Sequence, residues 1–208
     1  MKTKTTARPV RTQKERAALT REKILASAYT IFVRDGFEAS KLEEIAAAAG
    51  YTRGAFYKRF KNKEELFVAV AGQQIEDHIS KVLDGVHSGT DAKSKIQIFL
   101  QQFNESMVAG QNLGVLMLEF SLFVFRHPRM KKHLTSLNDQ INDGIRKTFE
   151  EIYANTDLKN ISLPTIGIGF YSLAQGLTLQ KIMNGSLITT QTSSDLLQLY
   201  LNAALGNS

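Results

Sequence analysis

The stretch AAAAGYTRGAFYKRFKNKEEL, residues 46–66, decides how this chain folds. Its alanines allow another helix to pack closely, and Gly50 is expected to end that first helix. Thr52 then offers a side-chain oxygen to cap a second helix, which we expect to reach only about Arg59. Two short helices joined by a glycine-containing turn form a helix-turn-helix.

The second helix of this motif carries aromatic and basic residues with two different tasks. A helix this short is not stable alone, so we expect Phe56 and Phe60 to hold it against the rest of the domain. Its outer face then offers small residues for close approach to duplex DNA, an arginine fork for guanine, and hydroxyl and ammonium groups for phosphates. The candidate DNA-binding residues are Ser40, Lys41, Thr52, Arg53, Gly54, Ala55, Tyr57, Lys58 and Lys63.

Charge is distributed unevenly along the 208 residues. Residues 1–63 carry 15 Lys and Arg against 6 Asp and Glu, whereas residues 64–208 carry 11 against 14. A cationic end on a mildly acidic body favours a polyanionic partner at that end. A solvated basic tail, or a helical hairpin with a solvated cationic face, would produce the same charge pattern.

Hydrophobic periodicity predicts an all-α chain in three parts. Residues 1–19 are basic and aperiodic and are expected to form a flexible arm. Residues 20–80 are expected to form a DNA-binding domain, with a first helix capped by Thr20, a second opened by Ser40 and Glu43, and a fourth opened by Asn62 and ending near Ser80. Residues 81–208 are expected to add a larger helical domain with helices over 92–110, 113–125, 128–153, 164–184 and 194–205.

The segment REKILASAYTIFVRDGFEASKLEEIAAAAGYTRGAFYKRFKNKEELF, residues 21–67, resembles the DNA-binding domain of the TetR (tetracycline repressor) family. The shared features are an opening helix, a Gly-Phe linker, an Ile-Ala pair, an Ala-Gly turn, Gly-x-x-Tyr in the recognition helix, and Phe-Lys-x-Lys-Glu-x-Leu. The resemblance implies that Ser40 and Lys41 touch the DNA backbone and that residues 52–55 lie against bases or sugar-phosphate. It also implies that Tyr57 and Lys63 clamp phosphates, while Lys58 is added on charge and position.

The resemblance further implies a helical ligand domain whose last two helices form a four-helix dimer interface. In this chain those helices would be 164–184 and 194–205, which carry apolar faces with small residues. A dimer would set two recognition helices about 34–36 Å apart, as two half-sites of a palindromic operator require. An intrachain core is the alternative interpretation of the same faces. The candidate interface residues are Tyr171, Ala174, Leu177, Leu196, Leu197 and Tyr200.

A ligand pocket is expected in the C-terminal part, because Met and Phe side chains suit an adaptable site for an apolar molecule. Asn104 and Glu119 are isolated polar residues that could orient a ligand or, alternatively, join helices by hydrogen bonds. The candidate pocket residues are Phe99, Phe103, Asn104, Met107, Met117, Glu119, Phe120, Phe123 and Phe170.

Other kinds of chemistry have little support in the sequence. The chain has no Cys, its four His lack the spacing of metal ligands, and its glycines do not follow a strand as a phosphate loop requires. We therefore expect no cofactor, no metal site and no enzymatic activity. The lack of a signal segment or of an apolar run of about 20 residues favours a cytoplasmic protein without a membrane partner.

The leading hypothesis is a dimeric transcriptional regulator that binds a palindromic DNA operator and is released by a small, apolar effector. Repression is the commoner role in the family that the chain resembles. Two alternatives remain open at this point. The chain could bind DNA without sequence preference, or it could be a helical small-molecule-binding protein without operator specificity.

Overall fold

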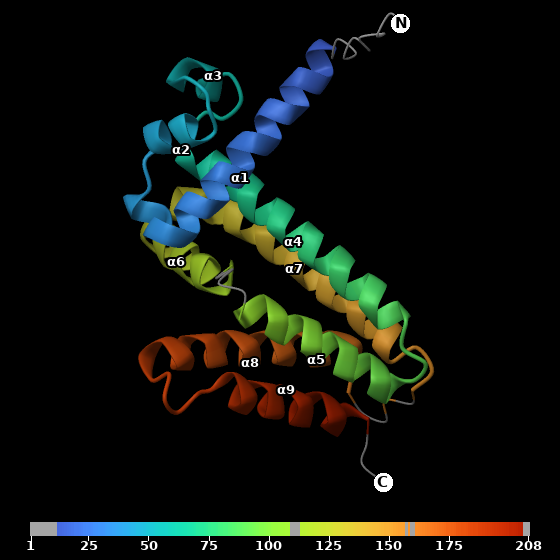
Figure 1. The fold of residues 1–208 in the computed structure, drawn as a ribbon. Helices are drawn as coiled ribbons and strands as arrows, with labels where there is room; N and C mark the ends of the chain where they lie inside the picture. The colour runs from blue at the N-terminus through green and yellow to red at the C-terminus, as the bar shows by residue number, and fades with distance from the viewer. Residues whose placement is uncertain (1–11, 109–112, 157, 159–160, 206–208) are drawn as a thin grey trace, which may run out of the picture. The chain divides into compact units, whose positions relative to one another are not determined.

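The computed structural model describes residues 12–108, 113–156, 158 and 161–205. Within these ranges the chain is all-α, with nine α-helices, one 3-10 turn and no strand, which confirms the predicted fold class. Figure 1 shows the elements in chain order. They are α1 Gln13–Ala39, α2 Leu42–Ala48, α3 Arg53–Tyr57, α4 Lys63–His87, α5 Ala92–Val108, α6 Leu113–Arg126, η1 Pro128–Met130, α7 Lys131–Ile152, α8 Leu163–Met183 and α9 Thr190–Ala204.

The chain divides into two compact units between Val70 and Ala71. The division lies inside α4, ten residues before the boundary expected from the sequence. The predicted helix end near Ser80 was wrong, because α4 continues to His87. Val86 is fully buried in the core of the C-terminal unit, and this burial favours the extra two turns.

The first helix begins earlier than the sequence analysis expected. Residues 1–11 of the predicted flexible arm lie outside the described residues, but residues 13–19 belong to α1. Thr12 and Glu15 form a capping box, in which the Thr12 side chain accepts from the Glu15 backbone N–H and the Glu15 carboxylate accepts from the Thr12 N–H. Thr20, the predicted cap, lies inside the helix and donates its hydroxyl to the carbonyl of Arg16.

The core of the N-terminal unit is built around three phenylalanines. Phe32, Phe37 and Phe67 are each at most 1% exposed, and their ring centroids lie 5.0–6.0 Å apart. Gly36 turns the chain between Phe32 and Phe37, with φ 80° and ψ 170°. This backbone region is open to glycine and to almost no other residue, so Gly36 allows both neighbouring rings to enter the same core.

The C-terminal unit packs the second part of α4, five further helices and one turn around a second apolar core. α5 lies against α9, α8 lies against α7 and α9, and α6 lies against α7 and α8. α4 and α7 run side by side, as Figure 1 shows and as the contact of Ile79 with Gly144 confirms. α9 begins four residues before its predicted start, because Thr189 accepts from the Thr192 N–H and caps it.

Membrane-spanning helices and metal-binding groups are both absent from the described ranges. No helix there combines the length and apolar character that crossing a membrane requires. No group of three or more His, Asp and Glu residues in those ranges is arranged to hold a metal ion.

Replacing Gly36 with Ala is expected to lower the free energy of unfolding by about 1–3 kcal/mol, because a Cβ makes the local backbone conformation strained. Gly114→Ala is the matched control, since Gly114 lies in α6 and a Cβ there would meet Thr178 at an ordinary 3.7 Å. Urea unfolding of the full chain measures both. A loss for G36A no larger than that for G114A would contradict the assigned role of Gly36.

Candidate nucleic-acid interface

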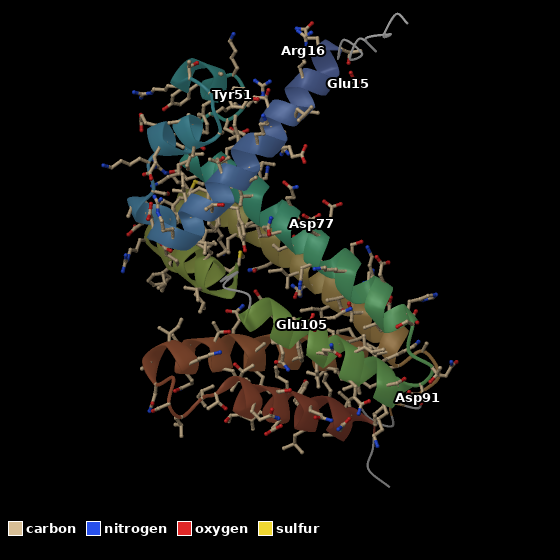
Figure 2. All side chains as sticks on the ribbon, in the orientation of Figure 1. Glu15, Arg16, Tyr51, Asp77, Asp91 and Glu105 are labelled. Atoms are coloured by element: carbon tan, nitrogen blue, oxygen red, sulfur yellow. The ribbon has the colours of Figure 1, made fainter. Side chains whose placement is uncertain are left out.

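The turn between α2 and α3 is fixed by backbone hydrogen bonds. The Gly50 N–H donates to the carbonyl of Ala47, and the Tyr51 N–H donates to that of Ala46. This is the Schellman arrangement, which needs a left-handed residue after the helix, and Gly50 has φ 78°. The glycine therefore ends α2 as predicted and directs the chain into α3; Figure 2 labels Tyr51 in this turn.

The recognition helix α3 is five residues long and is held by its apolar side. Thr52 caps it by accepting from the Ala55 N–H at 3.4 Å. Phe56 is 0% exposed and Phe60 is 3% exposed, with their ring centroids 5.7 Å apart. The structure thus confirms Thr52 as the cap and both phenylalanines as the anchors of the helix.

The other side of α3 is open to solvent. Tyr57 is 43% exposed, and a Cβ on Gly54 would meet nothing closer than the Thr52 Oγ1 at 4.0 Å. The structure therefore brings five of the nine candidate DNA-binding residues together on one exposed surface, with Ala55 half-buried at its edge. These five are Thr52, Arg53, Gly54, Tyr57 and Lys58.

Arg53 has two neighbours within this surface. Its Nη1 lies 3.2 Å from Oε1 of Glu43 on the first turn of α2. Its Cζ lies 5.5 Å from the centroid of the Tyr57 ring. A hydrogen bond to the Tyr57 side chain, followed by the charges of Tyr57 and Glu43, raises the pKa of the Arg53 guanidinium. The sequence analysis treated Glu43 only as part of a helix cap and missed this pairing, because no local rule links residues ten apart across a turn.

Ser40 and Lys63 lie elsewhere and have other partners. Ser40 is 4% exposed, and its hydroxyl donates to the Phe37 carbonyl at 2.8 Å. The predicted capping box at Ser40 was wrong, because Lys41 is the residue that precedes α2 and it makes no side-chain cap. The Lys63 ammonium donates to the carbonyls of Glu38 at 2.8 Å and Ser40 at 3.1 Å, and lies 4.9 Å from the centroid of the Phe37 ring.

These contacts give Lys63 a structural task within the N-terminal unit. Its ammonium binds the backbone that leads out of α1, so it joins the start of α4 to the turn before α2. Lys41 remains exposed beside them. Of the cations expected to meet phosphate, Lys41 and Lys58 are therefore the ones whose side chains the structure leaves on the surface.

The candidate pocket residues lie mainly in packed helix interfaces. Phe99 and Phe170 are buried with ring centroids 5.0 Å apart, and Phe103 lies 5.4 Å from Phe170. Met117 and Phe120 are buried on α6, where Glu119 and Phe123 are half-buried. The side chain of Met107 lies outside the described residues. Apolar residues at helical spacing predict burial. The sequence alone does not tell whether such residues pack in a core, as they do here, or line a cavity.

An open hollow of about 710 Å³ lies between α5 and α9. Its lining is rich in amides and differs from the expected Met and Phe surface. Asn104 is the one candidate pocket residue on that lining, and its Nδ2 donates to Ser194 Oγ at 2.9 Å. The lining residues are Gln97, Leu100, Gln101, Asn104, Glu105, Ser194 and Gln198, of which Figure 2 labels Glu105 on α5.

The candidate interface residues divide into two groups. Ala174, Leu177 and Leu197 are at most 8% exposed within the single chain, so they belong to its own core. Tyr200 is half-buried and donates its hydroxyl to the Ile166 carbonyl at 3.0 Å. Leu196 is exposed and Tyr171 is half-buried. α8, α9 and the loop between them also expose apolar residues that were not among the six candidates, namely Ile168, Leu179, Ile182, Met183, Leu187 and Leu199.

Comparison with known proteins places a family match in the N-terminal unit. Residues 24–70 match the family described as bacterial regulatory proteins, tetR family. The chain is 35% identical over 98 residues to the HTH-type transcriptional regulator TtgR of Pseudomonas putida, which is 46% of this chain and 47% of TtgR. It is 44% identical over 64 residues to the transcriptional repressor BepR of Brucella suis, 31% of each chain. The matches thus span about half or less of these relatives.

Solved structures resemble the whole fold at low sequence identity. A TetR-family regulator from a Rhodococcus species aligns with a TM-score of 0.77 at 15% identity, covering 91% of this chain and all of that one. The regulator FadR from Bacillus subtilis, solved in complex with stearoyl-CoA, aligns with a TM-score of 0.68 at 16% identity, covering 89% and 97% of the two chains. The helix-turn-helix geometry and the family match agree that residues 24–70 form a domain of the tetR family of bacterial regulatory proteins, and the solved structures share the fold of the whole chain.

Proposed function

We propose that this protein regulates transcription by binding a specific DNA operator through α3. The observation that carries the proposal is the division of α3 into two faces. Phe56 and Phe60 are buried, while Arg53, Gly54, Tyr57 and Lys58 are exposed. A helix held in this way can enter the major groove without changing the packing beneath it.

The contacts that we propose follow from the chemistry of the exposed residues. Arg53 offers a fork of donors that matches the O6 and N7 atoms of guanine. Gly54 lets the helix backbone come close to the base edges. Lys58 and Tyr57 reach phosphates on one side of the groove, and Lys41 reaches them from the start of α2. Ser40 and Lys63 act indirectly, by fixing the turn that positions α2.

We propose that the chain acts as a homodimer through α8 and α9. Leucine and isoleucine side chains exposed at helical spacing leave an apolar stripe that water hydrates poorly. Ile168 is 62% exposed on α8, and Leu199 is 66% exposed on α9. We therefore propose that the interface is formed by these exposed side chains. Ala174, Leu177 and Leu197 are not part of it, because they are already buried within their own chain.

A small-molecule effector is the third part of the proposal, and it rests on relatives. FadR from Bacillus subtilis was solved with stearoyl-CoA, so a protein of this fold can bind an acyl thioester. In this chain Phe103 is half-buried at the edge of the aromatic cluster, and we propose that an apolar effector displaces it. The effector can release DNA only if it binds the two conformers with different affinities. Titration of acyl-CoA into the operator complex tests this part.

Selection of bound fragments from random and genomic duplex DNA tests the proposed operator. We expect enrichment of an inverted repeat with a guanine in each half-site. Arg53→Ala should reduce discrimination at that guanine by about 1–3 kcal/mol, because the bidentate contact is lost. Lys58→Ala is the matched control and should weaken binding to all sequences about equally, since a phosphate contact carries no sequence information.

The outcome of that selection also separates the alternatives. If no fragment binds better than random duplex at moderate salt, operator recognition is refuted. Binding with a steep salt dependence and no preference would support the non-specific binder instead.

Leu199→Asp is expected to convert the dimer to monomers in sedimentation experiments at micromolar concentration. Two carboxylates per dimer would be placed in an apolar interface, where burial of an unpaired charge is strongly unfavourable. Leu122→Asp is the control, because Leu122 is similarly exposed at 60% but lies on α6. A dimer that survives L199D, or that is lost equally in L122D, would contradict the proposed interface.

A further inference from the structure

The contact between Glu43 and Arg53 joins the two helices of the motif. Glu43 stands on the first turn of α2 and Arg53 is the first residue of α3. The two side chains are 57% and 66% exposed, and their nearest atoms are 3.2 Å apart. An ion pair this exposed contributes little to stability. Its partners can therefore be exchanged for others when DNA arrives.

The neighbouring acidic residue has a different arrangement. Glu44 pairs with Arg34 on α1, and Arg34 also pairs with Asp35 at 2.6 Å. Arg34 thus faces two carboxylates, and loss of Glu44 leaves it still paired. Arg53 has one carboxylate among its described contacts, together with the Tyr57 ring at 5.5 Å. Loss of Glu43 would therefore leave the Arg53 charge uncompensated.

We propose that Glu43 is a specificity-determining residue that competes with DNA phosphates for Arg53. This inference rests on the proposed function of α3 in DNA binding. On a sequence without the correct base, Arg53 remains with Glu43, and its charge is not available to the phosphate backbone. On the correct sequence, guanine offers two acceptors to the guanidinium fork and displaces the single carboxylate contact.

The physical basis is that the two competitors of Glu43 depend differently on DNA sequence. A phosphate oxygen would replace Glu43 with a contact of similar kind at any sequence, and would leave the released carboxylate beside a polyanion. Guanine offers O6 and N7 to the guanidinium fork only at the correct position, so this contact offsets the loss of Glu43 on the operator alone. Glu43 is thus expected to weaken binding to unrelated DNA more than binding to the operator.

Salt dependence of binding measures this effect directly. Each additional phosphate contact makes the slope of log K against log salt more negative by about 0.9. Glu43→Gln keeps the size of the side chain and removes its charge. We expect E43Q to steepen the slope on random duplex by about 0.9 for each Arg53 released, and to lower the ratio of operator to random affinity by about tenfold.

Two further variants make the test specific. Glu44→Gln removes the same charge one residue away and should leave the slope on random duplex close to that of the wild type, because Arg34 keeps Asp35. In an Arg53→Ala background, E43Q should leave both the slope and the affinity ratio unchanged, because no arginine remains to be released. Thermal unfolding of all variants confirms that they are folded.

The possible outcomes separate this inference from the proposed function. A wild-type protein that binds all duplexes equally would refute operator recognition. Equal slopes for wild type and E43Q on random duplex would refute the role of Glu43 even if the wild type is selective. Equal effects of E43Q and E44Q, or an effect of E43Q that persists in R53A, would show that general electrostatic repulsion is responsible and would also overturn it.

Discussion

The burial of Phe56 and Phe60 is the constraint on which the proposed DNA-binding surface depends. A helix of five residues lies far below the length at which helices are stable in water. Its conformation is therefore determined by tertiary contacts, together with the Schellman turn at Gly50 and the Thr52 cap. Because both anchors are buried, Arg53, Tyr57 and Lys58 are left on the exposed side of the helix.

A second group of contacts sets the position of α2. Gly36 kinks the chain between Phe32 and Phe37, and this allows the three phenylalanines of the N-terminal core to meet. Lys63 then binds two carbonyls in the segment that follows. Lys63 was expected to contact DNA directly. Its contacts instead fix the turn that positions α2, the helix before α3.

Local sequence rules predicted the helices of the N-terminal unit well, because caps, glycine turns and apolar periodicity act over few residues. They placed Thr52, Phe56 and Phe60 correctly. They misplaced the first helix start, because Thr12 and Glu15 form a capping box eight residues before Thr20. The pairing of Glu43 with Arg53 depends on the crossing of two helices and has no local signal. In the C-terminal unit, α8 is apolar on several sides, so the sequence could not tell core residues such as Leu177 from exposed ones such as Ile168.

The separation of anchors from exposed residues in α3 has a consequence for how such a protein can diverge. Exposed substitutions away from packing, caps and strained turns usually change stability by less than about 0.5 kcal/mol. Position 53 can therefore vary after gene duplication while the fold is retained, and under the proposed function each copy can acquire a different target sequence. The buried phenylalanines have no such freedom. The fold is therefore expected to change slowly, while the recognised DNA sequence can change fast.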